Sequence, residues 1–165
     1  MRYQSWKAEK HRLVEPLGLV LKGGAWYLVG RVDGDARTYR ISRMLDIKIL
    51  DQRFERPKSF DLAGYWQAST RRLEADLHQN SAKIRLSPWG AKMLEAFTSP
   101  YVRAAAKISS TVDAEGWYTA TMPVGSIRQA CVEFLRFGAD AEVLEPPELR
   151  AKMAAVVADM KQIYG

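Results

Sequence analysis

Cysteine and histidine are scarce in this 165-residue chain, which contains one cysteine, Cys131, and two histidines, His11 and His78. One cysteine cannot form an internal disulfide, and a cysteine with two separated histidines cannot complete a zinc site. Glycine-rich phosphate loops are also absent from the sequence. We therefore expect no metal and no cofactor, and the small acid–base inventory predicts that the chain is not an enzyme. Cys131 is predicted to be a buried thiol.

Long apolar runs are missing as well. No run approaches the roughly 18 residues that span a bilayer, and the first ten residues are too polar for a secretory signal. Hydrophobic residues make up 47% of the chain and charged residues 27%, as in an ordinary globular protein. These features predict a cytoplasmic protein of one or two domains without membrane contact.

Positive charge is unevenly distributed along the chain. Residues 1–58 contain 13 Lys and Arg against 7 Asp and Glu, whereas residues 59–165 contain 12 of each. The whole excess of +6 therefore lies in the first third, which indicates that this part meets a nucleic acid or an anionic small molecule. The alternative is that these basic side chains only solubilise the surface.

The first third of the chain has the pattern of short strands. They are predicted at residues 1–6, 12–24, 25–32, 37–41 and 46–50, with a hairpin turn at Asp33-Gly34. Five short strands cannot cover both faces of an open sheet, so we expect a small closed or nearly closed barrel. A helix capped by Asp61 is predicted over residues 61–77 as a connector.

The rest of the chain has a mixed pattern. Strands are predicted at 82–86, on both sides of a turn at 113–116, and at 141–146; helices are predicted at 87–97, 125–137 and 147–164. The order β-α-β-β-α-β-α predicts an α+β ferredoxin-like domain with an extra helix. The predicted organisation is a barrel at 1–56, a connector at 57–80 and a ferredoxin-like domain at 81–165.

Three arginines, Arg37, Arg40 and Arg43, fall within seven residues. Because side chains alternate along a strand, Arg37 and Arg40 should start on opposite faces. The planar guanidinium fork suits phosphate or carboxylate, so this group is a candidate anion site. The alternative is that the arginines pair with nearby carboxylates, namely Asp33, Asp35, Asp46 or Asp51.

The segments PLGLVLKGGAWYLVGRV and RTYRISRM resemble the WYL domain, named after the triplet Trp26-Tyr27-Leu28. The tail FLRFGADAEVLEPPELRAKMAAVVADM resembles the C-terminal extension, WCX, of bacterial DeoR/YafY-like transcriptional regulators. The resemblance implies an Sm-like, SH3-like barrel at residues 1–56. It also implies a winged helix-turn-helix ahead of the barrel. This sequence contains none, so duplex DNA would be bound only through a missing N-terminal domain.

The resemblance further implies a ligand-sensing role, in which a basic surface binds a nucleotide-like ligand or single-stranded nucleic acid. The positions carried over are Tyr27, Arg37, Arg40 and Arg43, with weaker matches at Tyr3, Ser5 and Arg12. Trp26 and Leu28 alternate with Tyr27 and are predicted to lie in the core. Where the family usually has Asp before the last arginine, this chain has Ser42.

Two other functions stay open at this point. The chain could be a structural module that only dimerises the regulator, and a homodimer is expected in the sensing case too. It could also be an Sm-like RNA-binding protein, which would need stacking aromatics such as Tyr27 and Tyr39 beside the basic residues.

Overall fold

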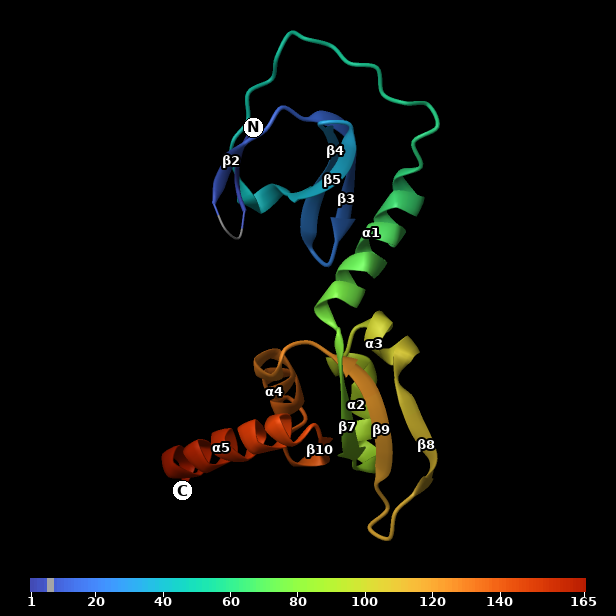
Figure 1. Cartoon of the computed structure of the whole chain (residues 1–165), viewed down its shortest axis with the longest axis vertical. Helices are drawn as coiled ribbons and strands as arrows, with labels where there is room; N and C mark the ends of the chain where they lie inside the picture. The colour runs from blue at the N-terminus through green and yellow to red at the C-terminus, as the bar shows by residue number, and fades with distance from the viewer. Residues whose placement is uncertain (6–7) are drawn as a thin grey trace. The chain divides into compact units, whose positions relative to one another are not determined.

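The computed structural model describes residues 1–5 and 8–165, and the chain divides into two compact units, Met1–Ala68 and Ser69–Gly165 (Figure 1). Helix α1 (Leu62–Leu77) crosses the division, so its first residues belong to the N-terminal unit and its last residues to the C-terminal unit. The protein is a mixed α/β molecule with several small antiparallel sheets. The domain limits at residues 56 and 80 stay a prediction.

The N-terminal unit contains two three-stranded antiparallel sheets. One has the order β2-β1-β6, formed by Glu9–His11, Arg2–Gln4 and Met44–Asp46. The other has the order β3-β4-β5, formed by Glu15–Lys22, Ala25–Val32 and Asp35–Arg40. Asp33 and Gly34 both have positive φ, which confirms the hairpin turn predicted there. A 3-10 turn, η1 (Ile41–Arg43), joins β5 to β6.

These two sheets do not close into the predicted barrel. Among the strands of residues 1–5 and 8–46, none pairs across from one sheet to the other. Pro16 has no N–H to donate, and the β3-β4 ladder shifts register between Pro16 and Gly18, so β3 is irregular near its start.

The prediction of a strand at residues 46–50 is also wrong. Strand β6 ends at Asp46, because β1 has three residues and offers pairing partners only for Met44 and Asp46. Ile47 and Ile49 are instead exposed, at 61% and 92%.

The β3-β4-β5 sheet is covered on both faces. On one face Tyr3 of β1 packs edge-on against Tyr39, with ring centroids 5.1 Å apart. On the other face Trp66 of α1 packs against Tyr27 at a centroid distance of 5.1 Å. The sheet therefore separates two environments, one toward β1 and one toward α1.

Helix α1 begins where the sequence predicted. The Asp61 carboxylate accepts a hydrogen bond from the Gly64 N–H at 3.0 Å, which confirms Asp61 as the cap. Phe60 packs on Tyr65 at a centroid distance of 5.7 Å, forming a hydrophobic staple across the first turn. The Tyr65 hydroxyl also donates to the Ala36 carbonyl at 2.8 Å and ties the helix to β5.

The C-terminal unit has one four-stranded antiparallel sheet with the order β10-β7-β9-β8. Its elements are β7 (Asn80–Leu86), α2 (Pro88–Phe97), α3 (Pro100–Ala105), β8 (Lys107–Val112), β9 (Tyr118–Val124), α4 (Ile127–Leu135), η2 (Gly138–Asp140), β10 (Ala141–Glu145) and α5 (Pro147–Tyr164). This is the strand order of the predicted split βαβ arrangement. Helix α3 was not predicted, although Ser99-Pro100 repeats the start signal of Ser87-Pro88.

The core of this unit lies between the sheet and its helices. Alternate residues of β7 and β9 face it, and Ile84, Leu86 and Ala120 are fully buried. Cys131 on α4 is 3% exposed, which confirms the prediction of a buried thiol.

Candidate functional site

The arginines of β5 lie on opposite faces of its sheet, as the alternation predicted. Arg40 pairs directly with Tyr27 of β4, whereas Arg37 pairs with Gly30. Directly paired residues share a face, so Arg40 lies on the α1 side with Tyr27 and Trp66. Arg37 lies on the β1 side, where Tyr39 is buried.

On the β1 side, the side chain of Tyr39 is 7% exposed and its hydroxyl makes no hydrogen bond with any described residue. Burial raises the pKa of Tyr39, and the positive charges of Arg37 and Arg12 lie close enough to oppose that rise. Tyr3 packs on the Tyr39 ring and accepts a hydrogen bond from the Arg40 backbone N–H at 3.2 Å. Tyr3 covers the ring of Tyr39, and the charges of Arg12 and Arg37 act on its hydroxyl; we call these four residues the Tyr39 cluster.

The Tyr39 cluster has two guanidinium groups that are only loosely held. Arg37 lies 3.8 Å from Asp35, whose side chain is 78% exposed, so this ion pair is a weak one. Of the carboxylates that could have paired with the arginines, Asp35 is therefore a partner for Arg37. Among the described residues, the Arg12 side chain donates to the His11 carbonyl at 3.1 Å, which engages one of its five N–H donors.

The remaining predicted site residues are Ser5, Arg43, Tyr27 and Arg40. Ser5 uses its hydroxyl in a local turn, donating to the Ala8 carbonyl at 2.5 Å and accepting from the Ala8 N–H at 3.1 Å. Arg43 is half-buried in the last turn of η1. Tyr27 and Arg40 form the second group, on the α1 side.

Trp26 does not lie in the core as predicted. It is 50% exposed and pairs with Leu21, itself 56% exposed, near the Gly23-Gly24 turn. The end of this hairpin therefore extends beyond the packed part of the sheet. Leu28, in contrast, is half-buried.

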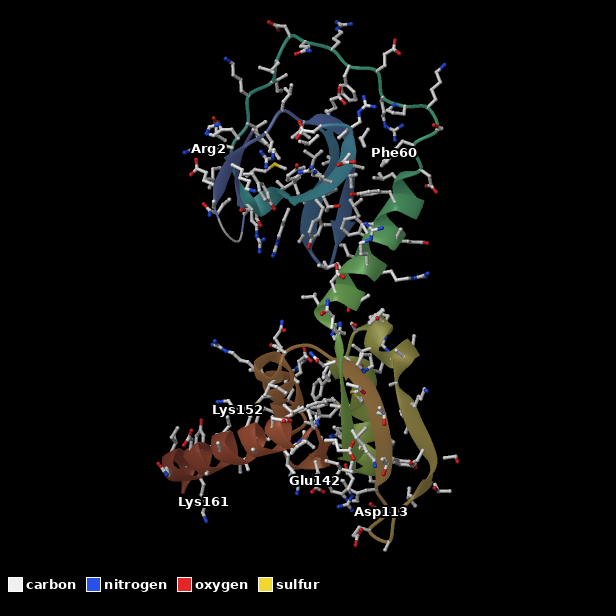
Figure 2. All side chains as sticks on the ribbon, in the orientation of Figure 1. Arg2, Phe60, Asp113, Glu142, Lys152 and Lys161 are labelled. Carbon is white, nitrogen blue, oxygen red and sulfur yellow. The ribbon has the colours of Figure 1, made fainter. Side chains whose placement is uncertain are left out.

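Two acidic residues of the C-terminal unit, Asp113 and Glu142, have arginine partners. Arg85 bonds to Asp113 at 2.7 Å and to Glu142 at 3.0 Å, two carboxylates labelled in Figure 2. The Trp117 N–H and Arg85 hold the pKa of Asp113 below its usual value, and Arg150 and Arg85 do the same for the pKa of Glu142. These carboxylates are neutralised by arginine and do not form a catalytic pair.

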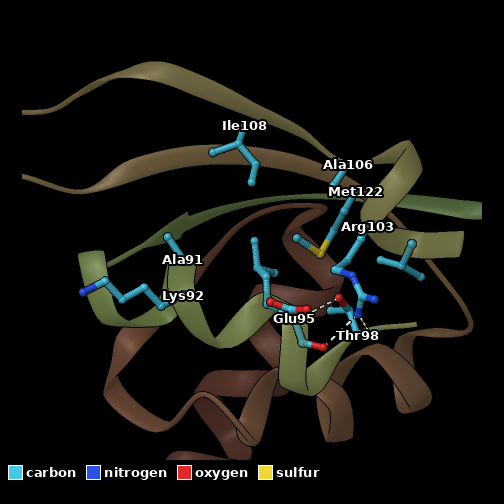
Figure 3. Close-up of a pocket in the computed structure, with 10 residues that line it drawn as sticks. Ala91, Lys92, Glu95, Thr98, Arg103, Ala106, Ile108 and Met122 are labelled. Atoms are coloured by element: carbon cyan, nitrogen blue, oxygen red, sulfur yellow. Dashed lines mark hydrogen bonds between the residues drawn. The ribbon is translucent and has the colours of Figure 1, made fainter. Parts of the chain in front are cut away.

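A cavity of about 510 Å³ also lies in the C-terminal unit, beside α2, α3 and β8 (Figure 3). Leu94, Val102 and Met122 form part of its apolar wall. The Arg103 guanidinium donates to the Glu95 carbonyl at 2.8 Å and so ties α3 to α2. Lys92, Glu95, Thr98 and Arg103 supply its polar groups.

Neither a metal site nor a membrane span is found in the part of the chain that the structure describes. No three His, Cys, Asp or Glu residues gather there in a way that could hold a metal ion. No helix among these residues combines the length and apolarity needed to cross a bilayer.

Comparison with protein families matches both parts of the chain. Residues 1–49 match the WYL domain, and residues 79–161, half of the chain, match the WCX domain. The chain belongs to the family of WYL- and WCX-domain proteins. The WYL match contains every predicted site residue, and the WCX match contains the four-stranded sheet.

The relatives of this WYL- and WCX-domain chain are longer. The uncharacterized HTH-type transcriptional regulator YobV of Bacillus subtilis (strain 168) is 32% identical over 161 residues, which cover 93% of this chain and 47% of YobV. The chain therefore spans about half the length of the curated relative that it matches.

Two solved structures are also similar. Proteasome accessory factor B/C (PafBC) of Arthrobacter aurescens has 26% identity and a TM-score of 0.39, over 92% of this chain and 23% of that chain. A CRISPR Cas-related protein has 19% identity and a TM-score of 0.51, over 94% and 44%. The second likeness is one of fold.

Proposed function

We propose that this WYL- and WCX-domain chain is the ligand-sensing part of a transcriptional regulator. Its N-terminal unit binds an anionic nucleotide-like ligand or single-stranded nucleic acid through its arginines, and binding changes the DNA affinity of the regulator. The relationship to an HTH-type regulator supports the regulatory class. A ligand can shift such an equilibrium only by its differential affinity for the two states.

The observation that carries this proposal is the buried Tyr39 hydroxyl without a partner. Leaving a buried hydroxyl unpaired costs about 1–3 kcal/mol. A local opening of the cover over Tyr39 would let a ligand oxygen take the hydrogen bond and recover this cost. Arg37 and Arg12 lie close enough for their positive charges to act on the Tyr39 hydroxyl. An anion with hydrogen-bonding oxygens, such as phosphate, satisfies both requirements.

A longer ligand would also reach the α1 side of the sheet. Arg40 is exposed there beside the half-buried Tyr27. Tyr27 and Trp66 already pack on each other, so they leave less aromatic surface for base stacking than an open platform does. A small nucleotide therefore needs only the Tyr39 cluster. An oligonucleotide would contact both the β1 side and the α1 side of the β3-β4-β5 sheet.

The test is binding of fluorescently labelled adenosine monophosphate and of a labelled oligothymidine to the full chain, followed by polarisation. Arg37→Gln should weaken nucleotide binding. Arg2→Gln is the matched control, because Arg2 is an exposed arginine of the same unit in a similar ion pair, 3.3 Å from Glu9. If the parent chain binds neither probe at millimolar protein, the sensing proposal is wrong.

A second candidate function is dimerisation without a ligand, which exposed residues on α5 favour. Met153 and Val156 pack on the core, and the same helix continues with Val157, Met160 and Ile163 exposed at 54%, 43% and 73%. This half of the helix extends away from the sheet of its own unit (Figure 1). Met160→Glu should convert a dimer to a monomer in light scattering if α5 is the interface.

A further inference from the structure

A cavity of about 790 Å³ lies in the N-terminal unit, between the segment that follows β2 and the irregular segment that follows β6. We call it the 47–54 cavity after the residues of that second segment. Its apolar wall is formed by Leu13, Val14, Leu28, Met44, Ile47 and Leu50. Its volume falls within the range of small-molecule sites.

We infer that the 47–54 cavity is a binding site for an aliphatic anion, a molecule with one alkyl chain and one carboxylate or similar head group. Neither the WYL-domain match nor the relatives' names assign such a ligand to this place. The site overlaps the Tyr39 cluster at Arg12 and is otherwise distinct from it. Neither Tyr39 nor Arg37 lines the 47–54 cavity, and Arg12 is the residue at the border of both.

The apolar wall is accessible rather than buried. Leu13 is 64% exposed, Ile47 61% and Leu50 46%, although all three line the same concave surface. Apolar side chains that gather in a hollow and stay exposed mark a place where an apolar group is covered on binding. An alkyl chain laid along them removes this surface from water.

The charges around the cavity favour an anion. Four basic or imidazole side chains line it: His11, Arg12, Lys48 and Arg53. One carboxylate, Glu15, also lines it, and its Oε2 accepts a hydrogen bond from Arg31 Nε. The one acid among the described lining residues is thus already neutralised, and the remaining charge is positive.

The kind of wall distinguishes an alkyl chain from a nucleobase. Half of the described lining residues are Leu, Ile, Val or Met, with Phe54 as the one phenyl ring and Gln52 as the one side-chain amide among them. Recognition of a base needs stacking surfaces and groups that hydrogen-bond its edge. An aliphatic chain needs neither, so it fits this lining better than a nucleotide does.

Calorimetric titration of the full chain with three ten-carbon probes tests this site. Decanoate, decanol and decyltrimethylammonium have the same chain length and differ in head-group charge; each is used below its aggregation concentration. Decanoate should bind saturably, and the ammonium compound should bind roughly tenfold more weakly or not at all, because like charges repel in the cavity. Equal binding of all three probes would overturn the inference.

Two variants locate the binding, each with a control of the same chemistry. Arg53→Gln should weaken decanoate binding several-fold, and Leu13→Asp, which places a carboxylate in the wall, by roughly tenfold or more. The controls are Lys22→Gln and Leu21→Asp on the β3-β4 hairpin, where Leu21 is also exposed, at 56%. If the controls weaken binding as much as the cavity variants, decanoate adheres to exposed leucines and the inference is wrong.

Arg37→Gln separates this inference from the proposed function. The variant should lose nucleotide binding and keep decanoate binding, because Arg37 does not line the 47–54 cavity. Loss of both ligands in this variant would contradict a second site. Decanoate binding by a parent chain that binds no nucleotide would support the cavity and reject the nucleotide-sensing proposal.

Discussion

The two units of this protein bury very different amounts of apolar side chain. Among the described residues, fourteen hydrophobic residues of the C-terminal unit are buried in one cluster. In the N-terminal unit the buried hydrophobic residues are Leu17, Val29, Val32 and Tyr39. One of these four carries an unpaired hydroxyl. The C-terminal unit therefore has the larger apolar core, whereas the N-terminal unit has the loosely held arginines and the open cavity on which the two proposed sites rest.

The largest expected effect is a loss of stability in the C-terminal unit, caused by a substitution far in sequence from the proposed binding residues. Phe134 is 2% exposed in the C-terminal core, so Phe134→Ala should lower the free energy of unfolding of that unit by about 3–5 kcal/mol. Urea denaturation measures this loss. Nucleotide binding by the N-terminal unit should be unchanged at low urea; its loss would show that the two units do not act separately.

The next effect is a difference in nucleotide binding between substitutions on the two faces of the β3-β4-β5 sheet. Arg37→Ala should weaken nucleotide binding by about 1.5–3 kcal/mol, the usual value of a hydrogen bond to a charged group. Arg40→Ala should leave nucleotide binding unchanged, because Arg40 lies on the α1 side.

For oligothymidine the expectation differs, because a strand reaches both sides. Arg40→Ala should make the slope of log K against log salt shallower by about 0.7, the value for one phosphate contact. Polarisation at several salt concentrations measures the slope. Arg150→Ala in the C-terminal unit is the control and should leave it unchanged.

A smaller effect is expected at Tyr39, where one substitution should raise stability and lower nucleotide affinity. Tyr39→Phe removes the unpaired hydroxyl, so the free chain should become more stable by roughly 1 kcal/mol while its nucleotide affinity falls. Thermal unfolding and polarisation measure the two changes. A variant that is less stable than the parent would show that the hydroxyl already has a partner in the free protein.

The smallest effect concerns the acid stability of the C-terminal unit. The folded-state pKa values of Asp113 and Glu142 are lowered, so their contribution to stability is present above the unfolded-state pKa of about 4 and is lost as pH falls through the folded values. Arg85→Met removes a partner of both carboxylates. Its unfolding free energy should therefore decrease less between pH 7 and pH 3 than that of the parent.

Local signals in the sequence predicted most elements of both units. Asp61 caps α1 and Ser87 caps α2, because a cap needs only its own side chain and the next turn of backbone. The Asp33-Gly34 turn and the opposite faces of Arg37 and Arg40 follow from backbone geometry in the same way. Strand β2 was missed, since Glu9–His11 carries no apolar alternation and is a strand only through its pairing with β1.

The candidate site could be predicted only in part. The excess of positive charge in residues 1–58 and the spacing of Arg37, Arg40 and Arg43 can be seen without a structure. It could not show that Ser5 is used in a turn, that Trp26 is exposed, or that the Tyr39 hydroxyl is buried without a partner. Those outcomes depend on which side chains from distant segments come together, as Tyr3 and Tyr39 do across 36 positions of the chain. Helix starts, turns and strand faces are set by interactions over a few residues, whereas burial, ring packing and cavities exist only once the sheets and helix have assembled.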